Sequence, residues 1–145
     1  MLDSASLSQL SQVITEVTAP AFLLGAVASF TSVLISRMNR IIDRSQALNA
    51  ISDDDASRAR LKSDIPRLKH RAVLLNRAIL FSTISAIATS SLVIFAFVSA
   101  YLQVRHEYGV APLFVVALTC FTIALVNLAR ETLIALNEYD HFSTS

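Results

Sequence analysis

Three arginines that follow the first long apolar run have a spacing that could gather anions. Arg37, Arg40 and Arg44 lie at i, i+3 and i+7, so a helix would place them on one stripe. Arg71 and Arg77 stand shortly before the second apolar run. Guanidinium groups bind phosphates, so these five residues are candidates for a basic vestibule or for contacts with anionic lipid. The simpler interpretation is that they are topology anchors and structural ion pairs.

Two carboxylates are placed to pair with this basic stripe. Asp43 is three residues from Arg40 and can pair with it along one helix. Glu131 follows the third apolar run, at about the membrane depth of Arg40 and Arg77, where its solvation is incomplete. We therefore expect Glu131 to pair with an arginine of the basic segment, most simply Arg40 or Arg77. If all the arginines are paired in this way, the attraction for anions disappears.

No pattern for catalysis, metal binding or cofactor binding stands out in the sequence. The histidines and serines match no nucleophile elbow or zinc-protease helix, and no two carboxylates form an inward pair. Cys120 is the only cysteine, which argues against a zinc site. We expect no enzyme, no cofactor and no metal. We also expect no nucleic-acid partner, because the basic segment directly adjoins apolar spans.

The elements that must position these charges are three long apolar helices. The chain is 54% hydrophobic, and residues 17–36, 78–104 and 108–129 contain no Asp, Glu, Lys or Arg. About 20 apolar residues cross a bilayer as a helix, so the sequence predicts an all-α integral membrane protein. The predicted segments are an amphipathic N-terminal stretch (1–16), a first transmembrane helix (17–36), a basic cytoplasmic hairpin (37–77), a second transmembrane helix (78–102), a short external loop (103–111), a third transmembrane helix (112–130) and a cytoplasmic tail (131–145).

Charge asymmetry predicts the direction of the chain through the membrane. Residues 37–77 hold ten basic and five acidic residues, a net charge of +5, whereas the rest of the chain has a net charge of −4. Positive loops stay in the cytoplasm, so we expect the hairpin and the C-terminus inside and the N-terminus outside. The N-terminal stretch is then either an interfacial helix or an extension of the first span.

The basic segment has the pattern of an antiparallel helical pair. Two seams repeat at 3.5-residue spacing, and Asp53, Asp54 and Asp55 suit the turn between them. Pro66 either kinks the returning arm or marks a helix that begins near Asp64. The outgoing seam is Leu34, Met38, Ile41, Ser45, Leu48 and Ser52, and the returning seam is Leu61, Ile65, Leu68, Ala72, Leu75 and Ile79.

Two faces of the spans carry small or hydroxyl side chains. Such residues let helices approach closely or bond across an interface, so both faces are candidates for helix contacts or for a pore lining. The third span carries a stripe that becomes polar toward its end. The two faces are Ala21, Gly25 and Ser29, and Ser82, Ser85 and Thr89; the stripe is Cys120, Ala124, Asn127, Glu131 and Ala135.

Several strings together resemble the signature of a bacterial three-span membrane-protein family of unknown function. They are Met38-Asn39-Arg40-Ile41-Ile42-Asp43-Arg44 with Ala47-Leu48, then His70-Arg71, Leu75-Asn76-Arg77-Ala78-Ile79 and Arg130-Glu131. The resemblance covers about residues 10–137. It implies a location in the bacterial inner membrane, and it implies no activity.

Two functions are compatible with this pattern. Three spans are too few to enclose a path alone, so the first hypothesis is a homo-oligomer whose spans surround an ion-conducting pore. The alternative is a non-conducting scaffold in the lipid bilayer, whose cytoplasmic hairpin binds a partner or anionic lipid.

The predicted topology has a direct test. A single cysteine at Ser6 should react with a membrane-impermeant thiol reagent added outside, and a single cysteine at Asp54 should not. The reverse labelling pattern would contradict both the orientation and the cytoplasmic hairpin.

Overall fold

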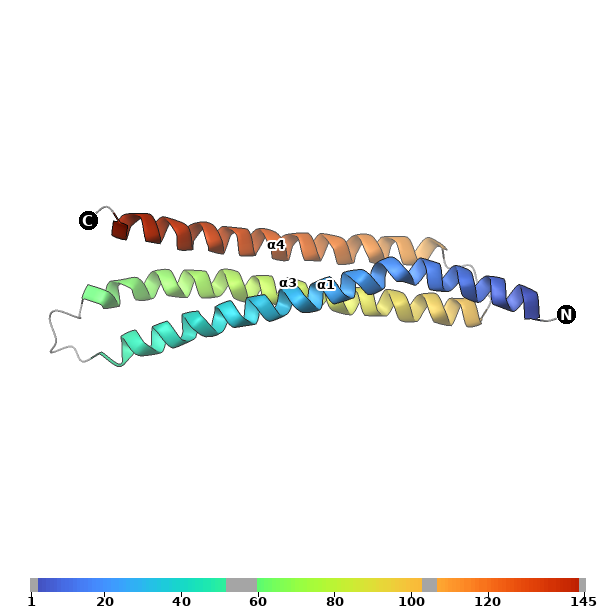
Figure 1. The fold of residues 1–145 in the computed structure, drawn as a ribbon, viewed down its shortest axis with the longest axis horizontal. Coiled ribbons are helices and arrows are strands. Elements are labelled where there is room, and N and C mark those ends of the chain that lie inside the picture. The colour runs from blue at the N-terminus through green and yellow to red at the C-terminus, as the bar shows by residue number, and fades with distance from the viewer. Residues whose placement is uncertain (1–2, 52–59, 103–106, 144–145) are drawn as a thin grey trace. The chain divides into compact units, whose positions relative to one another are not determined.

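The chain is helical throughout the part that the structure describes. The structure is a computed structural model, and it describes residues 3–51, 60–102 and 107–143. Its elements are α1 (Asp3–Asn49), the short 3-10 helix η1 (Arg60–Asp64), α3 (Ile65–Tyr101) and α4 (Glu107–Ser143) (Figure 1).

Three stretches are long and apolar enough to cross a membrane. They are Leu10–Asn49, Lys62–Tyr101 and Gly109–Leu136. The prediction of an all-α chain with three long helices, each apolar enough to span a membrane, is thereby confirmed. The cytoplasmic helical hairpin and the exact membrane boundaries stay predictions.

Helix boundaries bear on the alternatives that the sequence leaves open. The N-terminal stretch from Asp3 onward belongs to the same continuous helix, α1, as the first predicted span. The returning helix α3 begins at Ile65, so Pro66 lies in its first turn, where a missing N–H breaks no helical bond. Helix α4 begins at Glu107, before Pro112, so the described part of the expected loop 103–111 is helical.

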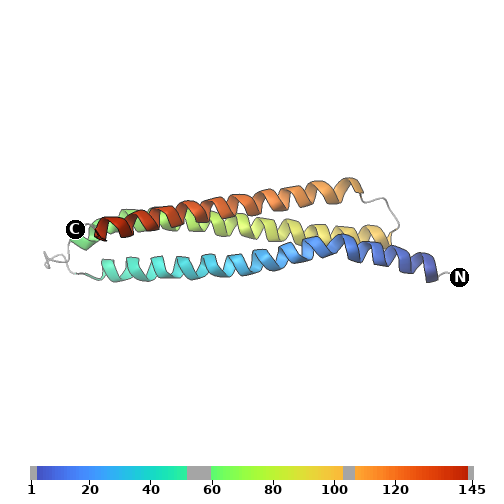
Figure 2. The same cartoon turned by 45° about the horizontal axis from the view of Figure 1, so that its top comes forward.

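The helices contribute to two compact units. The first unit is Met1–Phe30 with Phe81–Thr122, and the second is Thr31–Leu80 with Ile123–Ser145. Each unit contains one segment of α1, one of α3 and one of α4. Within each unit, α3 runs opposite to α1 and α4 (Figures 1 and 2).

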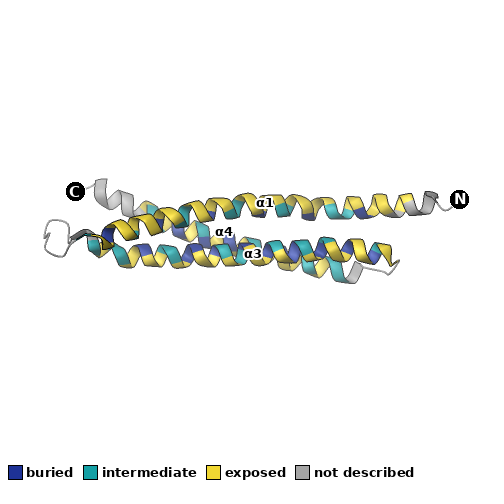
Figure 3. Cartoon of the chain, turned by 90° about the horizontal axis from the view of Figure 1, so that it is seen from below, coloured by how far each residue is buried: buried dark blue, intermediate teal, exposed yellow. Residues whose placement is uncertain are grey.

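Buried positions recur at heptad spacing along the helices, among exposed ones (Figure 3). A period of 3.5 residues is the pattern by which helices pack side chains into one another along a seam. On α1 every seventh residue is buried: Val13, Pro20, Val27, Leu34, Ile41 and Leu48. On α3 buried residues alternate by three and four: Leu75, Ala78, Ser82, Ser85, Thr89, Leu92, Ala96 and Ser99.

The first unit packs α3 and α4 through small and hydroxyl side chains. Ser85 Oγ donates a hydrogen bond of 2.8 Å to the Ala117 carbonyl oxygen, which joins the two helices directly. Small residues allow this approach, and in lipid such contacts replace the missing hydrophobic drive for association. The rings of Phe30 and Phe121 meet edge to face at 5.3 Å, which joins α1 to α4.

The second unit is packed through larger aliphatic residues. Leu34, Ile41 and Leu48 of α1 and Leu68 and Leu75 of α3 are all buried. These are members of the two predicted seams, and Met38, Ser45 and Ala72 between them are half-buried. Ser52 and the expected turn residues Asp53, Asp54 and Asp55 lie outside the described residues, as does the side chain of Leu61.

Leu75→Asp should destabilise the protein far more than Val73→Asp. Leu75 is 0% exposed in the seam, whereas Val73, on the same helix, is 44% exposed. An unpaired charge in a packed seam costs about 3 kcal/mol or more, and most exposed substitutions stay within about 0.5 kcal/mol. Thermal unfolding of both variants in detergent measures the difference. Equal midpoints would contradict a packed seam at Leu75.

Candidate functional site

Glu131 occupies a core position of the second unit. It lies seven residues after the buried Ala124, in heptad register with it, and its side chain is only 1% exposed. A carboxylate withdrawn from water in this way needs charged partners and hydrogen-bond donors. The heptad spacing therefore places an acid on the buried stripe of α4, after Ala124 and the buried polar Asn127.

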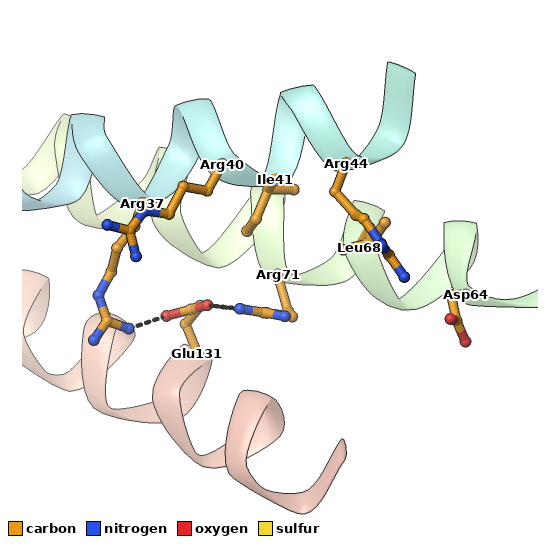
Figure 4. A pocket seen from close by; sticks show the side chains of 8 residues that line it. All are labelled: Arg37, Arg40, Ile41, Arg44, Asp64, Leu68, Arg71 and Glu131. Carbon is orange, nitrogen blue, oxygen red and sulfur yellow. Dashed lines mark hydrogen bonds and ion pairs between the residues drawn. The ribbon is translucent and has the colours of Figure 1, made fainter. Parts of the chain in front are cut away.

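Two arginines from two other helices bind the Glu131 carboxylate (Figure 4). Arg71 of α3 donates from Nε at 2.9 Å and from Nη2 at 2.8 Å, both to Oε1. Arg37 of α1 donates from Nη1 to Oε2 at 2.8 Å and also to Thr132 Oγ1 at 3.0 Å. One carboxylate thus ties together α1, α3 and α4.

The two ion pairs are not equivalent. The Arg71 side chain is 19% exposed and uses two N–H groups on one oxygen, whereas the Arg37 side chain is 39% exposed. Exposure to water weakens a salt bridge, so we expect the Arg71 pair to contribute more to stability.

A cavity of about 520 Å³ opens beside this triad. Four arginines and two carboxylates line it, which gives a formal charge of +2, and two aliphatic side chains complete the wall (Figure 4). The lining residues are Arg37, Arg40, Ile41, Arg44, Asp64, Leu68, Arg71 and Glu131. A concave surface with excess arginine is suited to bind an anion.

Two arginines of the cavity are not committed to the triad. Arg40 and Arg44 are exposed, and within the described part of the chain neither has an ion-pair or hydrogen-bond partner. The prediction that Glu131 pairs with an arginine of the basic segment is confirmed, but the choice of Arg40 or Arg77 is wrong, because Glu131 binds Arg37 and Arg71. Depth along the membrane alone does not specify the partner, because the rotation of each helix about its axis decides which arginine faces Glu131.

The other predicted site residues lie elsewhere. Asp43 is exposed on α1, and Arg77 is exposed on α3 and does not line the cavity. Two cavity residues, Asp64 and Leu68, entered the sequence analysis only as a helix start and a seam position. Thr132 was missed, and its only sequence signal is that it adjoins Glu131.

The two small-residue faces differ in their burial. Ser82, Ser85 and Thr89 are fully buried inside the chain, so this face forms an intramolecular helix contact. Ala21, Gly25 and Ser29 are exposed, and a Cβ built at Gly25 would meet no atom within 4 Å. Of the two faces, only the second is open to another chain.

Metal chemistry has no visible support in the described residues. Among them, no group of three or more His, Cys, Asp or Glu side chains is arranged to hold a metal ion. Cys120 is a free, half-buried thiol on α4. The arginine-lined cavity is therefore the candidate site that we consider further.

Comparison with known proteins identifies a family that the chain matches. The family described as "Protein of unknown function (DUF2721)" matches residues 17–141 of the chain, which include most of each long helix and every residue of the cavity. No curated protein and no solved structure matches the chain.

A double-mutant cycle should separate the two ion pairs of Glu131. With Glu131→Gln as the common variant, we expect a coupling energy of about 1–3 kcal/mol with Arg71→Gln and below about 1 kcal/mol with Arg37→Gln. The reason is the lower exposure and the paired N–H donors of Arg71. Thermal unfolding in detergent gives both coupling energies. An equal or larger coupling to Arg37 would contradict the ranking.

Proposed function

The chain belongs to this family of unknown function, and we propose that it is an inner-membrane scaffold whose cytoplasmic helical hairpin binds anionic lipid headgroups. The single observation that carries the proposal is the arginine-lined cavity with its formal charge of +2. Basic pockets between membrane helices on the cytoplasmic side are suited to bind lipid headgroups.

The position of the cavity in the sequence supports a headgroup as the ligand. Arg37 directly follows the uncharged run 17–36, and Arg71 stands seven residues before the uncharged run 78–104. The cavity thus adjoins the ends of two membrane spans. The excess of positive charge in residues 37–77 favours the cytoplasmic side, where anionic lipids are enriched.

A change in core composition supports a hairpin that leaves the bilayer. In the first unit, α3 buries mostly small or hydroxyl residues, such as Ser85, Thr89 and Ala96. In the second unit the seam is built from Leu and Ile. Burial of large aliphatic side chains stabilises packing mainly in water, whereas small residues stabilise close packing in lipid.

A second candidate is the homo-oligomeric, ion-conducting pore. The observation that favours it is the exposed face of Ala21, Gly25 and Ser29, which offers a close contact to a second copy. Because the Ser82, Ser85 and Thr89 face is buried within the chain, the proposed pore axis would lie nearest the first span.

Anionic lipid should be retained selectively by the purified protein. In nanodiscs of mixed phosphatidylglycerol and phosphatidylcholine, native mass spectrometry should detect phosphatidylglycerol bound in preference to phosphatidylcholine. Arg40→Gln/Arg44→Gln should abolish the preference. The matched control Arg67→Gln/Lys69→Gln removes two charges from exposed positions outside the cavity and should retain it. Equal loss of the lipid preference in both variants would mean that diffuse surface charge, and not the cavity, selects the lipid.

Planar-bilayer recording tests the pore. Current from the purified protein that is altered by Gly25→Leu would support it, because the added side chain would block the proposed contact. The absence of current at any voltage would contradict the pore and favour the scaffold.

A further inference from the structure

The cavity around Glu131 is lined by guanidinium groups with unused donors. Arg37 uses only Nη1 for Glu131 and Thr132, so its Nε and Nη2 have no partner among the described residues. Arg40 and Arg44 also lack partners there, and they are one helical turn apart on the same wall. In Figure 4 Arg37 reaches from α1 to Glu131, the Arg40 side chain extends toward Arg37, and the Arg44 side chain extends toward Leu68 and Asp64. A ligand bound there would meet donors from several directions.

The charge of the lining indicates the charge of the ligand. Glu131 and Asp64 offset two of the four arginines, which leaves a formal charge of +2. A monoanion would neutralise half of this excess, whereas a dianion would neutralise all of it. Ile41 and Leu68 form part of the wall, and apolar walls reduce the screening of charges by water. The cavity therefore favours a dianion over a monoanion.

The geometry of the donors indicates the shape of the ligand. Arginine binds phosphate through two parallel N–H groups, and a terminal phosphate offers three oxygens to separate guanidinium groups. A phosphomonoester carries a charge of about −1.5 to −2 at pH 7, whereas a phosphodiester carries a single negative charge. We propose that the cavity is a binding site for a dianionic phosphomonoester group, held by Arg40 and Arg44 with help from Arg37.

Glu131 has a positioning role in this site. Its carboxylate holds Arg37 and Arg71 from opposite sides, so their side chains are ordered before the ligand arrives. The Glu131 carboxylate also repels anions. An anionic ligand therefore needs positive charge from other residues of the cavity. That charge comes from Arg40 and Arg44, the two arginines whose groups are open to a ligand.

The phosphomonoester could belong to a lipid or to a soluble molecule. Phosphatidic acid presents such a group at the membrane surface, and inorganic phosphate or a soluble phosphomonoester presents the same chemistry in water. The cavity volume of about 520 Å³ leaves room for more than the phosphate alone. The inference deepens the proposed function, on which its lipid form rests.

A matched pair of soluble probes tests the dianion claim. Isothermal titration of methyl phosphate and dimethyl phosphate would be carried out on the full chain in phosphatidylcholine nanodiscs at pH 7.5. We expect the affinity for methyl phosphate to exceed that for dimethyl phosphate by about tenfold or more, because only methyl phosphate is a dianion. Equal affinities, or no binding of methyl phosphate, would overturn the inference.

Variants locate the binding. Arg40→Gln/Arg44→Gln should weaken methyl phosphate binding about tenfold or more, and Arg67→Gln/Lys69→Gln should leave it within about twofold. Both pairs are exposed, so thermal unfolding should confirm that each variant is folded. Equal weakening by both pairs would assign the binding to diffuse charge and overturn the site.

A lipid arm separates this inference from the proposed function. With equal fractions of phosphatidic acid and phosphatidylglycerol, we expect phosphatidic acid to be retained preferentially, and Arg37→Gln to reduce the preference. Equal retention of both lipids would overturn the phosphomonoester inference and leave the anionic-lipid scaffold standing. Binding of methyl phosphate without preference for any anionic lipid would support the site with a soluble ligand and overturn the lipid scaffold.

Discussion

The carboxylate of Glu131 is the constraint on which the second unit depends. It takes a core position in the heptad register of α4, seven residues after the buried Ala124. A buried charge of this kind is tolerated only with well-placed partners, and Arg37 and Arg71 supply them from two different helices. The register of α1, α3 and α4 at this level is therefore set by one acid. A rotation of α1 or α3 would remove one of its two partners, and a rotation of α4 would remove both.

This ion-pair triad also explains why the neighbouring cavity is basic. Each arginine bound to Glu131 is neutralised in part, and the net excess of positive charge is carried by Arg40 and Arg44. The arginines of this stripe on α1 therefore differ in their partners. Arg37 faces the core and pairs, while the next two arginines of the stripe stand at the cavity wall with no partner among the described residues.

Glycine and serine residues of the helices show that a small residue can lie either on an open surface or at a contact within the chain. Gly25 belongs to a regular small-residue face, yet no atom comes within 4 Å of a Cβ built there. A Cβ at Gly109 would lie 2.7 Å from the Phe95 ring, so this glycine is the one that a close approach within the chain uses. Ser85 of α3 donates a hydrogen bond to the Ala117 carbonyl oxygen of α4. The face of Ser82, Ser85 and Thr89 is therefore buried within the chain and is not open to another chain. Small residues mark close approaches, but the neighbour is decided by tertiary packing.

The sequence by itself determined the helical class, the three apolar spans and the residues of the seam. These follow from charge-free runs of membrane length and from a 3.5-residue period, both of which are local properties of the chain. Leu34, Ile41, Leu48, Leu68 and Leu75 could be predicted as buried for that reason. Only the tertiary structure decided that Glu131 pairs with Arg37 and Arg71, and that Asp64 and Thr132 belong to the same neighbourhood. Such choices depend on the rotation and offset of helices that lie 60 or 94 residues apart in sequence, which no local period specifies.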